Sequence, residues 1–111
     1  MNKQIQAEPK RPLRLDLQGA FIRRTDLSGA NLEEANLAEA DLSGAVLRGA
    51  NMRNAKLVGT VLKGADLRGV KNLTIEQLSA AIVDEHTQLP DYIARAQLKP
   101  KRRRSGAMQR S

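Results

Sequence analysis

Apolar residues recur at every fifth position through the middle of the chain. Cut into fives from residue 15, the sequence gives eleven pentads that end at residue 69 without an insertion. The first position is Ala in eight pentads, the second is Asp or Asn in seven, and the fifth is Gly in seven. An internal repeat of this kind predicts a repetitive fold. The third positions, which are all apolar, are Leu17, Ile22, Leu27, Leu32, Leu37, Leu42, Leu47, Met52, Leu57, Leu62 and Leu67.

Neither a straight helix nor a straight strand can use this spacing. Five residues of α-helix turn through about 500°, so successive leucines would circle the helix. On a strand an odd spacing would place them on alternate faces. One apolar side results if the chain bends once per pentad, with positions one and three facing inward. Glycine tolerates the corners, and Asp or Asn can bond nearby backbone groups. The pattern therefore predicts a bent solenoid whose coils pair about 4.8 Å apart.

The same run resembles the pentapeptide-repeat proteins, whose motif is A-[D/N]-L-x-x. The match covers residues 15–69. The resemblance implies an all-β solenoid, a right-handed quadrilateral β-helix with four pentads in each coil. Eleven pentads would then make about 2.75 coils, which is short for a solenoid and requires covered ends.

The period changes after residue 70 to one that predicts a helix. Thr74 and Gln77 form the pattern of a capping box, and Leu73 and Leu78 that of a hydrophobic staple. The apolar stripe expected on this helix comprises Ile75, Leu78, Ala81 and Ile82. We expect it to lie across the last coil as an α-helical cap. A second short helix is expected over 91–98, with Tyr92, Ile93 and Ala96 facing the body.

These features divide the chain into four parts. Residues 1–14 form an N-terminal arm, 15–69 the β-helix, 70–98 the C-terminal helical cap and 99–111 a disordered basic tail. Apart from Met1, the arm contains only Ile5 and Leu13 as large apolar residues. Either the arm crosses the first coil, or a second molecule covers it, so a homodimer through an end of the solenoid stays open.

With four sides to a coil, residues twenty apart form columns. We number the faces from the pentad that begins at residue 15. On faces two and three, Phe21, Val46 and Val61 stand where the repeat usually has Asp or Asn. Arg48, Lys63 and Arg68 form a basic cluster beside them. These six side chains, the corner surface, are candidate contacts for a protein partner; the alternative is a solvated surface. On face four, Glu33 above Arg53 is expected to form an ion pair.

Composition argues against an enzyme. The chain has no cysteine, which excludes disulfides and thiolate metal sites and suits a cytoplasmic protein. Its one histidine, His86, follows Glu85 and is expected in a solvent-facing turn. No group of residues has the spacing of metal ligands, and no Gly-rich phosphate loop precedes a helix. No catalytic residue, metal or cofactor is therefore expected, and no apolar run reaches the ~18 residues of a membrane span.

The net charge of +7 lies at the ends, because residues 15–69 carry seven basic and seven acidic side chains. Contact with nucleic acid or an anionic membrane is one reading of the tail, and a solubilising extension is the other. The candidate polyanion contacts are Lys99, Lys101, Arg102, Arg103 and Arg104.

Three functions follow. The first is a structural module that binds an unidentified protein partner. The second is binding of nucleic acid or membrane through the tail. The third, implied by some members of the family, is a DNA mimic that binds gyrase or another type II topoisomerase. The neutral body and basic ends disfavour this third function, because a cationic rod is a poor imitation of DNA.

Overall fold

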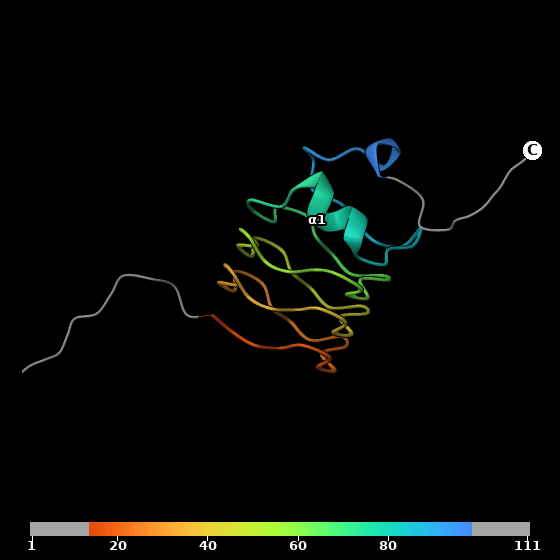
Figure 1. The fold of residues 1–111 in the computed structure, drawn as a ribbon. Coiled ribbons are helices and arrows are strands. Elements are labelled where there is room, and N and C mark those ends of the chain that lie inside the picture. Colours follow the sequence, from red (N-terminus) through yellow and green to blue (C-terminus); the bar gives the residue numbers. More distant parts are fainter. Residues whose placement is uncertain (1–13, 99–111) are drawn as a thin grey trace, which may run out of the picture.

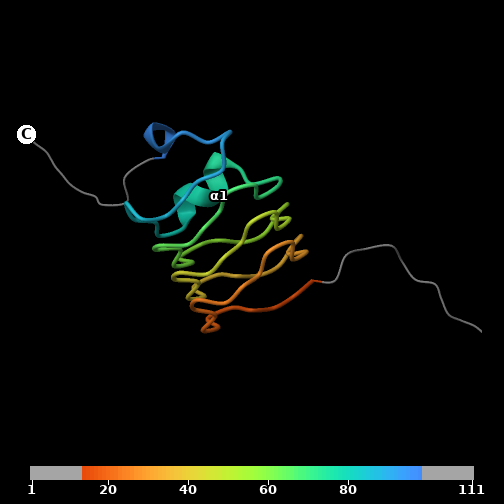
Figure 2. The same cartoon turned by 180° about the vertical axis from the view of Figure 1, so that it is seen from behind.

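The computed structural model describes residues 14–98, and these residues form a coil that rises from one end of the molecule to the other (Figure 1). The N-terminal arm before residue 14 and the basic tail from residue 99 lie outside the described residues. We refer to residues 15–34, 35–54 and 55–74 as the first, second and third coils. Seen from behind, the coils stack with α1 above them (Figure 2).

Parallel backbone bridges join each pentad to the one twenty residues later. Asp16 pairs with Asn36, and Asn36 pairs in turn with Lys56. The same spacing joins Phe21, Asp41 and Val61 on the next face. Four pentads therefore separate stacked residues, as the column assignment requires.

The hydrogen bonds between the first and second coils follow one rule on all four sides, and between the second and third coils only the amides of Gly49 and Asn54 depart from it. The amides at positions three and five donate to carbonyls at positions two and four of the coil above, as Leu17 does to Asn36 at 2.8 Å and Gly19 to Ala38 at 2.9 Å. The amide at position two donates back to position one below, as Asn36 does to Leu15 at 2.8 Å. The stacking is thus a backbone property and is independent of most side chains.

Each corner is a tight turn with a left-handed residue at the fifth position. The Ala20 amide donates to the Leu17 carbonyl at 3.0 Å across Gly19, whose φ is 70°. A positive φ at the third residue of such a turn is the type II geometry, which favours glycine. Four pentads hold this conformation without glycine, at Arg24, Glu34, Glu39 and Asn54.

The second position closes each corner from outside. Wherever it is Asp or Asn, its side-chain oxygen accepts the amide two residues later; examples are Asp26 to Ser28 at 3.0 Å and Asn36 to Ala38 at 3.1 Å. The expected bonding of these residues to the backbone is confirmed, in the form of an Asx-type turn.

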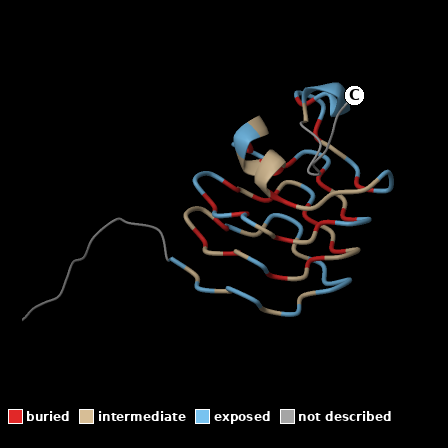
Figure 3. Ribbon diagram, turned by 45° about the vertical axis from the view of Figure 1, so that its right-hand side comes forward, coloured by how far each residue is buried: buried red, intermediate tan, exposed pale blue. Residues whose placement is uncertain are grey.

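Positions one and three line the interior. From Leu32 to Leu67 they are buried, apart from a few per cent of surface at some sites. Thr60 replaces alanine there at no cost in hydrogen bonding, because its hydroxyl donates to the Leu37 carbonyl at 2.7 Å. In the first coil Leu17, Ile22 and Leu27 are only partly buried, as Figure 3 shows for its lowest turn.

Helix α1, Ile75–Ala80, begins with the expected capping box. The Gln77 amide donates to Thr74 Oγ1 at 3.0 Å, and the Thr74 amide donates to Gln77 Oε1 at 2.8 Å. Leu73 and Leu78, the residues of the expected staple, are both buried. The Gln77 side-chain amide also donates to the Met52 and Ala55 carbonyls, which fastens α1 to the coil below it.

The expected helical stripe is wrong at its end. Ala81 is extended, with φ −91° and ψ 173°, so the helix ends at Ala80. Ile82 then pairs with Val61 and Gln88 with Asp66, as parallel bridges that continue the coil. The cap is therefore one short helix followed by a partial fourth layer of backbone, because open amides and carbonyls of the third coil remain to be paired.

The second expected helix over 91–98 is reduced to a single 3₁₀ turn, η2, Arg95–Gln97. Ile93 is buried as expected, but Ala96 is exposed. Tyr92 is 55% exposed, yet its hydroxyl donates to the Val70 carbonyl at 2.8 Å and accepts the Leu73 amide at 3.2 Å. The chain turns at Asp91 and Tyr92, where the Ile93 amide donates to the Pro90 carbonyl at 3.1 Å, so a single turn takes the place of a helix there.

Substitutions at two glycine corners can distinguish the cost of a left-handed backbone from the cost of steric crowding. At Gly29, with φ 71°, a new Cβ would meet nothing within 4 Å; at Gly59, with φ 69°, it would lie 3.2 Å from Glu39 Cγ. We expect Gly29→Ala to lower the free energy of unfolding by about 1 kcal/mol through the left-handed backbone alone. Gly59→Ala should lower the free energy of unfolding by more than this, because its Cβ also meets Glu39. In a Glu39→Ala background, where that contact is removed, Gly59→Ala should cost only as much as Gly29→Ala does. Urea unfolding measures the free energy of each variant. If Gly59→Ala costs the same with and without the Glu39 side chain, that side chain does not crowd the corner.

Candidate interaction surface

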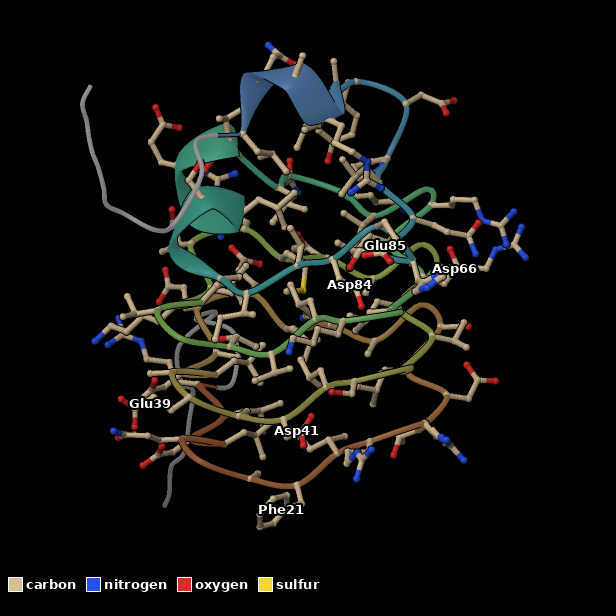
Figure 4. The ribbon with its side chains drawn as sticks, turned by 90° about the vertical axis from the view of Figure 1, so that its right-hand side faces the viewer. Phe21, Glu39, Asp41, Asp66, Asp84 and Glu85 are labelled. Atoms are coloured by element: carbon tan, nitrogen blue, oxygen red, sulfur yellow. The ribbon has the colours of Figure 1, made fainter. Side chains whose placement is uncertain are left out.

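One outward column of face two is mostly apolar. Phe21, Asp41, Val61 and Ile82 follow one another through the bridges. Phe21 is 86% exposed and is the most exposed large apolar residue among those described. Figure 4 shows Phe21 projecting away from the lowest coil, with Asp41 above it.

The neighbouring column of face three alternates in character. Asp26, Val46, Asp66 and Gln88 stack through the same kind of bridge. Val46 and Val61 are each half-buried. The structure therefore places the three apolar candidates on two adjoining faces, with Phe21 alone at the open edge of the first coil.

Each of the three apolar candidates is followed two residues later by a cation. The pairs are Phe21 with Arg23, Val46 with Arg48, and Val61 with Lys63. An apolar second position cannot accept the amide at position four, so these three corners lack the side-chain bond found at Asp and Asn corners. Arg23 was missed by the sequence reasoning, although the recurrence of a cation after each apolar substitution was visible in the sequence.

The basic cluster is largely compensated by acidic neighbours. Arg68 binds both carboxylate oxygens of Asp66, at 2.9 Å from Nε and 2.8 Å from Nη2. Arg48 Nε lies 3.9 Å from the same carboxylate, and Arg23 Nε lies 3.7 Å from Asp41. These exposed pairs contribute little to stability, because solvent screens them and ordering the long side chains costs entropy. The cations of the corner surface thus lie among acidic side chains, so the surface is apolar with charges of both signs.

Hydrogen bonding lowers the pKa of Asp41 and of Asp66, the two carboxyl groups beside the corner surface. The Arg68 side chain is the main cause at Asp66, opposed by partial desolvation. At Asp41 the main cause is the Ser43 hydroxyl, which donates at 2.6 Å. Both groups are therefore ionised at neutral pH and act as acceptors.

The expected Glu33–Arg53 ion pair is absent from the part of the chain that the structure describes. Arg14 Nε instead pairs with Glu34, at 2.9 Å. Sequence spacing placed Glu33 and Arg53 in one column but did not determine whether their side chains meet.

Asp84 is a further residue that the sequence reasoning did not single out. Its Oδ1 accepts the amides of Gly64 and His86, at 3.1 and 3.0 Å. The Arg95 guanidinium donates to the carbonyls of Asp84 and Thr87. This cluster fastens the partial fourth layer to the third coil, so we assign it a structural role.

His86 is exposed, and its Nε2 lies 3.6 Å from Glu85 in the turn expected for it. Within residues 14–98, no three His, Cys, Asp or Glu residues are grouped as metal ligands would be. Two open hollows of about 330 and 430 Å³ lie beside Lys56 and beside Gln77, and histidine lines neither of them.

A family model described as pentapeptide repeats matches the chain in eight copies, over residues 14–49 and 35–71. Together these ranges cover just over half of the 111 residues. The chain belongs to the pentapeptide-repeat family. The resemblance noted in the A-[D/N]-L-x-x pentads is confirmed, and so is the solenoid β-helix fold that it implied. No curated protein matches the sequence of this pentapeptide-repeat chain.

Solved structures similar to this pentapeptide-repeat chain include two from cyanobacteria. HetL of Nostoc sp. strain PCC 7120, a pentapeptide-repeat protein involved in the regulation of heterocyst differentiation, is 25% identical over 68% of this chain, with a TM-score of 0.43. This chain covers only 45% of HetL. Rfr23 of Cyanothece 51142 is 25% identical over 74% of this chain and 67% of its own, with a TM-score of 0.35. In the described part of the chain, no helix is long and apolar enough to cross a membrane.

The Asp66–Arg68 pair gives a test by pH. We expect Arg68→Gln to raise the pKa of Asp66 toward its ordinary value of 3.8, because the principal donor is lost. In the wild-type protein the folded pKa is depressed, so the contribution of Asp66 to stability is complete above 3.8 and is lost as the pH falls through the folded pKa. Carboxyl ¹³C titration by NMR measures the shift. Asp41, which depends on Ser43, is the internal control; a shift of both carboxyl groups would contradict the local cause.

Proposed function

We propose that this pentapeptide-repeat protein is a non-enzymatic module that binds another protein through its corner surface. The observation that carries the proposal is the column from Phe21 to Ile82. Phe21 is 86% exposed there, and two further pentads on the adjoining faces replace the Asx residue by valine. These substitutions give up a corner hydrogen bond without filling the core, which is the expected result if a contact outside the chain uses them.

The charges of the surface support a protein partner over a polyanion. Asp41 and Asp66 lie among Arg23, Arg48 and Arg68 within ion-pair distance. A surface of alternating sign repels a uniform polyanion locally but can be matched by alternating charges on a protein. For the same reason, together with the neutral body, a DNA mimic acting on gyrase has little support.

The proposal includes the finer features of the fold. The bridges twenty residues apart support a quadrilateral β-helix of about 2.75 coils over residues 15–69, and membership of the family supports a right-handed one. The capping box of α1 supports a C-terminal helical cap within residues 70–98. The absence of cysteine supports a cytoplasmic location.

Replacing Phe21, Val46 and Val61 together by asparagine tests the surface without removing a core residue. Asparagine is the repeat's own choice at these positions and accepts the amide at position four, so the variant should fold with equal or greater stability. We expect proteins that co-purify with the wild type from its native cells to be lost. Val58→Asn is the matched control, because Val58 is 63% exposed on face one. If the triple variant folds and still retains its partners, or if Val58→Asn loses them equally, the corner surface is not the contact.

A second function, binding of nucleic acid or an anionic membrane, is favoured by the five cations within residues 99–104. If all five contact phosphates, duplex DNA binding should weaken roughly 500-fold between 50 and 200 mM salt. We expect replacement of Lys99, Lys101, Arg102, Arg103 and Arg104 by glutamine to abolish this binding in a mobility-shift assay. Vesicles with and without phosphatidylserine distinguish a membrane target. Binding that survives the substitutions would exclude the tail as its cause.

A further inference from the structure

In the described part of the chain, the first coil ends in a rim of backbone groups that have no backbone partner. In the second coil all twelve groups that point toward the first coil are bonded to it: the amides at position two, and the carbonyls at positions two and four. The equivalent groups of the first coil have no backbone partner within residues 14–98, and among them only the Arg23 carbonyl has a side-chain donor there, Thr25 Oγ1 at 3.2 Å. These N-terminal rim groups are the amides of Asp16, Phe21, Asp26 and Asn31, and the carbonyls of Asp16, Gln18, Phe21, Arg23, Asp26, Ser28, Asn31 and Glu33.

At the opposite, C-terminal end of the solenoid, the open backbone carbonyls are all hydrogen-bonded. Position-one carbonyls are left open at the top of the third coil, and all four of them have donors. Gln77 donates to Ala55 and Tyr92 donates to Val70 through their side chains. The amides of Ile82 and Gln88 supply the remaining two, to Thr60 and Ala65. A following segment of the chain therefore covers one end, partly by backbone pairing and partly by side-chain donors.

The N-terminal rim has a defined chemistry. Each side offers one amide and two carbonyls, so acceptors outnumber donors by two to one. Behind the rim lie Leu17, Ile22 and Leu27, which are only partly buried. The rim therefore fits an extended segment that is rich in donors and carries a few apolar side chains.

We propose that residues 1–13 of this chain bind the N-terminal rim as an extended strap. Three cations, Lys3, Lys10 and Arg11, supply donors beyond the backbone amides, against a single acid, Glu8. Ile5 and Leu13 supply apolar contacts to the exposed layer. The strap is held at its start, because Arg14 pairs with Glu34 at 2.9 Å beside the rim.

The length of residues 1–13, and the count of donors and acceptors on the rim, favour the chain's own arm over a second copy of the protein. Thirteen extended residues reach about 43 Å, and a side of one pentad is at most about 17 Å, so the strap can cross the coil. If the N-terminal rims of two copies faced each other, each side would bring together four carbonyls and only two amides. Half of the carbonyls would then lack donors, and burying them would cost free energy.

Amide hydrogen exchange of the full chain, followed by NMR, tests the strap. We expect the rim amides of Phe21, Asp26 and Asn31 to exchange at least about tenfold more slowly than unprotected amides. The variant Ile5→Asn, Lys10→Gln, Arg11→Gln should lose that protection, while the amide of Leu42 in the second coil stays protected. Lys101→Gln, Arg102→Gln, Arg103→Gln is the control of equal or greater charge change and should leave the rim unchanged. Unprotected rim amides in the wild type, or protection that survives the arm substitutions, would overturn the proposal.

A spin label separates the chain's own arm from that of a second copy. The protein has no cysteine, so Ala7→Cys gives a single labelling site. Labelled protein should broaden its own rim amides on the side far from residue 14. A mixture of spin-labelled protein with ¹⁵N-labelled wild type should show no broadening. Broadening in the mixture would assign the rim to the arm of a second copy and would refute the intramolecular strap.

Discussion

The whole structure depends on one backbone constraint, a left-handed residue at the end of each pentad. That residue turns the chain through a corner and returns positions one and three to the interior. With the corner formed, each side presents the same amides and carbonyls at the same height, so the coils can bond to one another. A corner in the ordinary helical or extended region would misplace every later group in the ladder. The four corners without glycine show that the ladder can hold a residue against its own preference, at about 1 kcal/mol each.

Because the backbone stacks the coils and small residues fill the core, the outward positions are largely free of structural duty. Only the second position has a local task, which Asp and Asn perform by accepting an amide. Four pentads lack Asp or Asn at this position. One of them has Lys56 on face one, and the three apolar ones lie on two adjoining faces, each with a cation two residues later. Structure and chemistry are thus separated within five residues: odd positions build the coil, and even positions face whatever surrounds it.

The regular part of the fold could be predicted from sequence because its information is local and repeated. Leu42 and Ala45 specify an interior, and Gly44 a corner, without reference to any distant residue. The cap was harder. Thr74 and Gln77 predicted the start of the helix, but its end at Ala80 depends on open backbone groups of the third coil. Ile82 looks helical in sequence and becomes a bridge partner of Val61 because that partner is available. The candidate surface was predictable as positions. Its charge pairing was not, since the bidentate contact of Arg68 with Asp66 depends on side-chain rotamers that spacing does not determine.

The register of twenty residues also governs how such a chain can change length. An insertion of one or two residues breaks the alternation of corner and side and exposes the core. Insertion of a whole pentad preserves every corner and every buried leucine, yet it rotates all later residues by one face. Val61 would then leave the column of Phe21 and Asp41, and any surface assembled from several coils would be dismantled while the fold survived. Only an added set of four pentads lengthens the rod and keeps its surfaces aligned, so the geometry of the core sets the step size in which its exterior can evolve.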